Sequence, residues 1–148
     1  MLSQCHILIF MQIMNKNRGT KMTTLKFRAW DKKNKKMFTV MMIDFGQSYV
    51  MVKEPNGLWS ERDFDEVELM QFTGLFDKNG REIFESDIVK VLNSLYTVFY
   101  DSEKGSFRLK PHDKRWHTDY MSNFSHGGNF EVIGNMYENP ELLEVKER

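Results

Sequence analysis

The sequence predicts a mainly β protein with minor α content. Apolar and polar residues alternate with period two in several stretches, as in residues 25–30, which read LKFRAW. Gly, Asn and Asp separate such stretches at roughly ten-residue intervals, a spacing that favours a small barrel or sandwich over a helical bundle. Aromatic residues make up 14% of the chain, which excludes disorder as a description of the whole protein.

The N-terminal part, residues 22–66, is predicted to form a β-hairpin region. An apolar strand follows the turn-forming stretch 31–35, and a third strand ends at Pro55 and Gly57, residues that favour a turn. Residues 58–60 can pair back onto that strand, and the acidic stretch 61–68 is expected to be a solvated connection or a short helix. The predicted strands of this part are 25–30, 37–43 and 49–52.

The C-terminal part, residues 67–143, is predicted to form a small barrel. Hairpin turns are expected at 93–94 and 103–105, and residues 112–128 are expected to be a long loop or to form a short helix near 120–124. Asn139 followed by Pro140 predicts a short C-terminal helix, since Pro suits the first helical position. The predicted strands are 67–73, 88–92, 96–100, 107–109 and 130–133.

Three segments carry a family resemblance. They are residues 69–89, which read LMQFTGLFDKNGREIFESDIV, residues 27–31, which read FRAWD, and residues 132–143, which read VIGNMYENPELL. Together, and in their order along the chain, these segments make residues 25–143 resemble the YopX family of phage and prophage proteins. The resemblance implies a phage or prophage accessory protein whose family has no established biochemical activity.

The stretch 85–90 within these segments resembles the entry to a strand of an SH3-like barrel. Members of the family usually have Gly where this chain has Ser86. If the backbone there needs a positive φ, serine is disfavoured and the turn carries a modest strain.

Residues 1–21 are interpreted as a translated leader that precedes the natural start at Met22. Arg18 to Met22 can be encoded as AGG-GGN-ACN-AAA-ATG, a purine-rich ribosome-binding sequence before a start codon. The apolar run 7–14 does not fit a signal peptide, because the basic residues follow it. A short extra strand or helix stays open as the alternative.

Composition limits the compartment and the partners. The single Cys5 excludes an intrachain disulfide and a Cys-based zinc finger, and it indicates a reducing compartment, which we take to be the cytoplasm of a bacterial host. No run reaches the roughly 18–20 apolar residues that span a bilayer, so no membrane partner is expected.

The formal net charge of zero hides an uneven distribution. Residues 22–148 carry 18 basic and 21 acidic residues, a net charge of −3. Residues 26–36 hold six basic residues against Asp31 alone, and residues 61–68 hold five acidic residues against Arg62. Such opposite blocks suit self-association or intramolecular pairing.

No catalytic, cofactor or metal site is predicted, and the protein is not expected to be an enzyme. The stretch 77–80 lacks the spacing of a calcium loop and is explained by a hairpin turn, since Asn79-Gly80 adopts positive φ easily. His112, His117 and His126 do not follow a known zinc-ligand spacing.

The strongest binding signal is a basic and aromatic stretch within residues 104–120. Cations neutralise phosphates and flat rings stack on bases, so this composition suits single-stranded nucleic acid. The alternative is that these basic residues are simply solvated, which the acidic balance of the chain favours. The candidate nucleic-acid-binding residues are Lys104, Arg108, Lys110, Lys114, Arg115 and Trp116, interleaved with Phe107 and Tyr120.

The sequence therefore leads to two functional hypotheses. The first is a protein that acts by binding and assembles as a homo-oligomer, with apolar residues shared between core and contact surface, namely Phe45, Trp59, Phe72 and Phe76. The alternative is nucleic-acid binding through residues 104–120. The family-like segments are expected to meet in one folding nucleus made of Trp30, Phe72, Ile83, Ile88, Val89 and Ile133.

Overall fold

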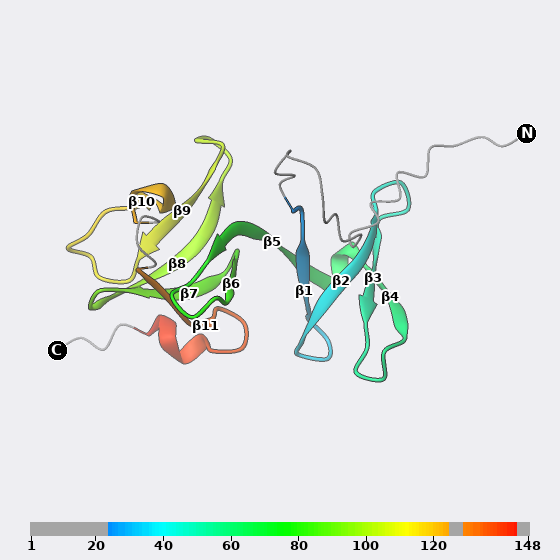
Figure 1. The fold of residues 1–148 in the computed structure, drawn as a ribbon. Coiled ribbons are helices and arrows are strands. Elements are labelled where there is room, and N and C mark those ends of the chain that lie inside the picture. The colour runs from blue at the N-terminus through cyan, green and yellow to red at the C-terminus, as the bar shows by residue number, and fades with distance from the viewer. Residues whose placement is uncertain (1–23, 125–128, 145–148) are drawn as a thin grey trace, which may run out of the picture. The chain divides into compact units, whose positions relative to one another are not determined.

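The structure is a computed structural model that describes residues 24–124 and 129–144 (Figure 1). The interpretation of residues 1–21 and the candidate ligand His126 fall outside the described residues. The strands form two antiparallel sheets, with the orders β4-β3-β2-β1-β5-β6 and β10-β9-β8-β7-β11. The chain divides into two compact units between Leu69 and Met70.

The first unit contains the predicted hairpin and two further strands. The sequence predicts a connection or short helix for the acidic stretch 61–68, but its first residues extend a strand and only three residues form a 3-10 helix. Arg62 within it pairs with Val50 of the neighbouring strand, which explains the extended backbone. The elements are β1 (Phe27–Asp31), β2 (Lys36–Asp44), β3 (Tyr49–Lys53), β4 (Trp59–Asp63) and the 3-10 helix η1 (Phe64–Glu66).

The core of the first unit lies on one side of its sheet. Ala29 of β1 is paired with Phe38 of β2, and Ile43 of β2 with Val50 of β3, so these side chains share a face. Every second residue is buried there, as the alternation predicts. The buried cluster consists of Ala29, Phe38, Val40, Ile43, Val50, Val52 and Val67.

The second unit contains the later part of β5 and six further strands. Within the described residues, β10 and β11 are the edges of the five-stranded sheet, so the predicted barrel is not closed. At the predicted C-terminal helix the structure has a four-residue 3-10 helix. The elements are β5 (Val67–Phe76), β6 (Glu82–Phe84), β7 (Asp87–Val91), β8 (Ser94–Asp101), β9 (Ser106–Pro111), β10 (Asp119–Tyr120), η2 (Met121–Asn123), β11 (Phe130–Asn135) and η3 (Pro140–Leu143).

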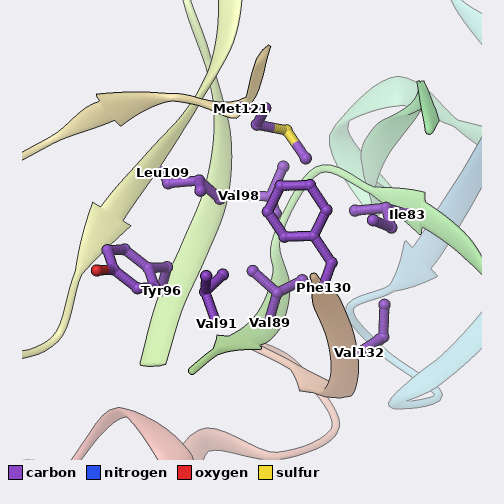
Figure 2. Packing of buried hydrophobic residues seen from close by; sticks show 9 residues of the cluster. All are labelled: Ile83, Val89, Val91, Tyr96, Val98, Leu109, Met121, Phe130 and Val132. Atoms are coloured by element: carbon purple, nitrogen blue, oxygen red, sulfur yellow. The ribbon is translucent and has the colours of Figure 1, made fainter. Parts of the chain in front are cut away.

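The core of the second unit is packed around Phe130, which is 1% exposed (Figure 2). Figure 2 shows its ring among side chains that β7, β8 and β9 direct to the same side of the sheet. The cluster consists of Ile83, Val89, Val91, Tyr96, Val98, Leu109, Met121, Phe130 and Val132.

The six residues that were expected to form one folding nucleus do not form one buried cluster. Of the six residues, five are buried and Ile133 is only half-buried. Ile83 and Val89 belong to the same cluster, whereas Ile88 alternates to the opposite side of β7. Trp30 lies in the first unit. The family-like segments therefore contribute to separate packing regions.

The stretch 77–80 is a tight turn, as predicted, and it also protects a sheet edge. Asp77 is 6% exposed, and its carboxylate accepts hydrogen bonds from the N–H groups of Asn79 and Arg81 and, at 3.1 Å, of Val132 in β11. Burial raises the pKa of Asp77, but these hydrogen bonds more than offset that effect and hold the pKa below its usual value. The Lys78 N–H donates to the carbonyl of Phe130 at 2.8 Å. The turn thereby occupies backbone groups that an edge strand would leave open.

Ser86 has a φ of 65°, the conformation that the resemblance suggested. Its N–H donates to the carbonyl of Val98 at 2.8 Å, and its carbonyl accepts from the N–H of Met136 at 2.9 Å. Both backbone groups are thus held by residues distant in sequence, and the turn cannot relax to negative φ without losing them.

We expect Ser86→Gly to raise the free energy of unfolding by about 0.5–1 kcal/mol. Removing Cβ relieves a left-handed strain of roughly 1–2 kcal/mol, and the greater freedom of glycine in the unfolded chain offsets part of it. Ser86→Ala keeps Cβ and is the control, which should give no gain. Urea titration compares the three proteins, and equal changes in both variants would contradict the role of φ.

A buried ion pair between Asp31 and Arg62 joins β1 to β4 in the first unit. Asp31 is 1% exposed, and its carboxylate accepts hydrogen bonds from Arg62 Nε at 2.7 Å and from the Asn34 backbone N–H at 2.7 Å. Arg62 also donates to Glu54 at 3.0 Å. Burial raises the pKa of Asp31, but the hydrogen bonds from Asn34 and Arg62 outweigh burial and lower the pKa to about 2. Asp31 is therefore charged in the folded protein at neutral pH.

The stability of the first unit should fall as the pH falls from 3.8 toward about 2, because the folded pKa of Asp31 is the lower one. The charged Asp31 carboxylate stabilises the folded state fully above the unfolded pKa of 3.8. Its protonation at lower pH should remove on the order of 2 kcal/mol from the free energy of unfolding. Asp31→Asn should lower stability by a similar amount at neutral pH, and its difference from the wild type should shrink in acid. Urea titrations followed by tryptophan fluorescence in a Trp116→Phe background report on this unit, because the two remaining tryptophans, Trp30 and Trp59, lie in it.

Asp113 is the matched control, because the pKa of its carboxyl is also lowered to about 2, first by the hydrogen bond from Arg115. That pair is exposed and only two residues apart, so it can persist in the unfolded chain. Asp113→Asn should leave the acid profile unchanged. If the free energy of unfolding of the wild type did not change with pH below 3.8, Asp31 would not have the lowered pKa in the folded protein.

Candidate binding surfaces

No group of three or more His, Cys, Asp or Glu side chains in the described part of the chain is arranged to hold a metal ion. His112 is half-buried, and its Nε2 lies 2.8 Å from the Thr97 hydroxyl. Burial lowers the pKa of His112; a hydrogen bond with the Leu142 backbone opposes this, and the charge of Lys110 adds to the lowering. His112 is therefore neutral at pH 7 and links β8 to the C-terminal segment.

The candidate nucleic-acid-binding residues fall into three places on the second unit. Lys104 lies in the turn between β8 and β9, and Arg108 and Lys110 lie on one side of β9. The loop after β9 carries the remaining three, Lys114, Arg115 and Trp116. The structure thus joins only Arg108 and Lys110 on one regular surface.

Arg108 is committed to its own neighbours. Its Nη1 donates to Asp101 at 2.7 Å, its Nη2 donates to the Thr118 carbonyl at 3.1 Å, and its guanidinium lies 4.7 Å from the ring centroid of Tyr120. The side chain is 16% exposed. The hydrogen bond from Arg108 is the main reason why the pKa of Asp101 is lowered. Arg108 therefore holds Tyr120 and β10 in place and has little charge to offer a phosphate.

Arg115 is paired in the same way. Its Nη2 donates to Asp113 at 2.6 Å, although its side chain is 83% exposed. The ring of Trp116 is about half exposed beside this pair. Lys104, Lys110 and Lys114 are exposed and make no ion pair with other described residues.

The strand register adds two residues that the sequence reasoning missed. Phe99 of β8 is paired with Arg108, and Lys90 of β7 is paired with Leu95 of β8, so both point to the same side as Lys110. We call this side, opposite to the Phe130 cluster, the outer face of the second sheet. Strand alternation could have found both residues, since Lys90 lies between the buried Val89 and Val91 and Phe99 follows the buried Val98.

The first unit presents an apolar outer face. Met42 of β2 is paired with Met51 of β3, and both alternate with buried core residues. Trp59 of β4, 47% exposed, lies on the same side, diagonal to Met51. Tyr49 and Met37 extend this surface, which we call the methionine face.

The four residues expected to combine core and contact roles differ in exposure. Phe45, Trp59 and Phe76 are 64%, 47% and 54% exposed, whereas Phe72 is 6% exposed and packs against Phe76 and Phe84. Phe72 is thus part of the packing, and the other three are open to solvent in this chain.

The opposite charge blocks meet within the first unit. Lys32 Nζ lies 2.9 Å from Glu68, and Arg62 binds Asp31 at 2.7 Å, so each block supplies one partner to the other. Of the two uses considered for these blocks, intramolecular pairing is therefore present. Pairing between two chains is therefore not needed to explain the opposite charge blocks.

Among the residues that the structure describes, none belongs to a helix with the length and apolar character required to cross a membrane.

Comparison with known proteins identifies the family. The family model described as "YopX protein" matches residues 26–144. The crystal structure of protein EF1440 from Enterococcus faecalis is 32% identical in sequence and has a TM-score of 0.57, over 81% of this chain and 98% of that chain. No match was found among the curated proteins. Because the family model spans most of the chain and a solved relative shares both sequence and fold, this protein belongs to the YopX family.

Proposed function

We propose that this YopX-family protein is a phage or prophage accessory protein that acts by binding rather than by catalysis, in the cytoplasm of a bacterial host, and that it assembles as a homo-oligomer. The methionine face carries the proposal. Methionine side chains are flexible and polarizable, and they are used often at surfaces that bind other proteins.

The contacts of the face support self-association. Met42 and Met51 are directly opposite each other, and Trp59 adds a large ring on β4, the edge strand of this sheet among the described residues. Aromatic residues and methionine are enriched at the centres of protein interfaces, where they exclude water. Charged side chains lie directly beside these apolar residues: Glu61 is paired with Met51, Asp63 with Tyr49 and Lys53 with Trp59.

We also propose that the second sheet is related to SH3-like barrels, although its described strands do not close into a barrel. Five short antiparallel strands and the tight positive-φ turn at Ser86 before β7 support this finer assignment.

We expect light scattering on the full chain to give a mass of at least two chains at micromolar concentration. Trp59→Lys should shift the protein to the monomer, because burial of a charge in an apolar contact is strongly unfavourable. Leu92→Lys is the control, since Leu92 is 84% exposed and lies in the turn between β7 and β8 of the other unit.

Circular dichroism establishes that both variants are folded. A monomeric wild type at high micromolar concentration would contradict the oligomer, and equal masses for the wild type and Trp59→Lys would show that the methionine face is not the contact.

A further inference from the structure

The methionine face of the first unit carries opposite charges at its two ends. Three cross-strand rows of side chains cover β3 and β4, and two of the rows continue onto β2, which lies beside β3 (Figure 1). At one end, Tyr49 lies between Asp44 and Asp63, and we call these three residues the acidic row. At the other end, Lys53 is paired with Trp59. The middle row consists of Met42, Met51 and Glu61.

The side chains of all three rows are accessible to a partner. None of these residues is buried, and the two outer strands have the most exposed positions, namely Lys53, Trp59, Glu61 and Asp63. The charged members of the rows make no ion pair with other described residues. The charges of this face are therefore available to a second molecule.

The open edge of β4 is already partly occupied by the chain's own side chains. The Phe64 N–H bonds back across the β3–β4 hairpin at 3.0 Å, so the backbone groups of Glu61 and Asp63 face the open edge. The Glu61 carbonyl accepts a hydrogen bond from Arg62 Nη1 at 2.8 Å. The Asp63 N–H donates to the Glu66 carboxylate at 3.1 Å. A further strand would have to displace both groups before it could pair with β4, so the edge is a poor contact for a partner.

A two-fold axis can relate two copies at this face in three orientations. An axis normal to the sheet places β4 of one copy beside β4 of the other, which the occupied edge opposes. An axis between the sheets and along the strands lays the acidic row of one copy over the acidic row of the other. An axis between the sheets and across the strands reverses the strand direction, so each acidic row meets Lys53 of the other copy. The charge layout favours this last orientation.

We propose that two copies of this chain pack face to face through the methionine face, about a two-fold axis that runs across the strands at Met51. Met51 lies midway between Tyr49 and Lys53 on β3, so this axis places Lys53 of each copy over Tyr49 of the other. There the ammonium group lies on a ring face and between the carboxylates of Asp44 and Asp63, two attractive contacts that the symmetry repeats.

The arrangement rests on the proposed self-assembly and specifies its partner as one second copy. The Met51 side chains of the two copies meet at the centre, where flexible thioethers fill the space between the sheets. Glu61 lies on the edge strand, so its exposed side chain stays at the margin of the contact, in water.

Sedimentation equilibrium of the full chain over a dilution series at low salt tests the ion pairs. The wild type should be a dimer. Lys53→Glu should raise its dissociation constant at least about tenfold, because repulsion replaces attraction at both symmetric contacts. Lys33→Glu is the matched control, since it makes the same charge change at an exposed position of the β1–β2 turn. It should leave the dissociation constant nearly unchanged, and circular dichroism shows that both variants are folded.

A mixture of two variants tests the symmetry. Asp63→Lys should also weaken the dimer, and an equimolar mixture of Lys53→Glu with Asp63→Lys should associate more tightly than either variant alone. In a mixed pair the reversed charge at position 53 of one chain meets the reversed charge at position 63 of the other, and the second contact is that of the wild type. Pairing within one chain is not restored by mixing. If Asp63→Lys does not fold, because Asp63 also precedes η1, Asp44→Lys takes its place.

The outcomes separate this arrangement from self-assembly as such. A monomeric wild type would remove both. A wild-type dimer that Lys53→Glu leaves unchanged, equal weakening by Lys53→Glu and Lys33→Glu, or a mixture that associates no more tightly than its components would leave the homo-oligomer in place and overturn the proposed arrangement.

Discussion

The pairing of Val98 with Leu109 on the inner side of the β8–β9 hairpin determines which side chains lie on each side of the second sheet. Both side chains are fully buried in the cluster around Phe130. Because side chains alternate along a strand, a shift of β9 by one residue against β8 would expose Leu109 and bury the neighbouring Arg108 and Lys110. The lost burial of Leu109, roughly 1.5–3 kcal/mol, and the burial of two cations together exclude that register.

The first sheet depends on a different constraint, because polar groups lie within its buried side. Asp31 and Arg62 come from strands that are not neighbours, and their contact at 2.7 Å spans β2 and β3. Arg62 also lies over the ring of Phe38, with its guanidinium carbon 5.5 Å from the centroid. Loss of one partner of such a pair leaves the other charge buried and uncompensated, so each of the two residues is needed once the other is present.

Local patterns predicted the strands and turns well, because alternation and turn residues act over a few positions. The tight turn at Asp77 followed from such local chemistry, whereas the positive φ of Ser86 was suggested by the family resemblance, because members of the family usually have Gly there. Sheet closure could not be predicted, since it depends on which edges meet. The same is true of the charge on Arg108: Asp101 becomes its partner only when the hairpin register places them diagonally across two strands. A sequence shows a cation, but only the fold shows whether that cation is already neutralised.

The register of the β8–β9 hairpin is therefore the most direct test of this account. Nuclear Overhauser contacts between backbone protons of facing residues report cross-strand pairing in solution. We predict contacts that pair Val98 with Leu109 and Phe99 with Arg108, which keep Arg108 and Lys110 on the outer face. Contacts that instead pair Leu109 with Thr97 or with Phe99 would place the cations inside the sheet and contradict the account.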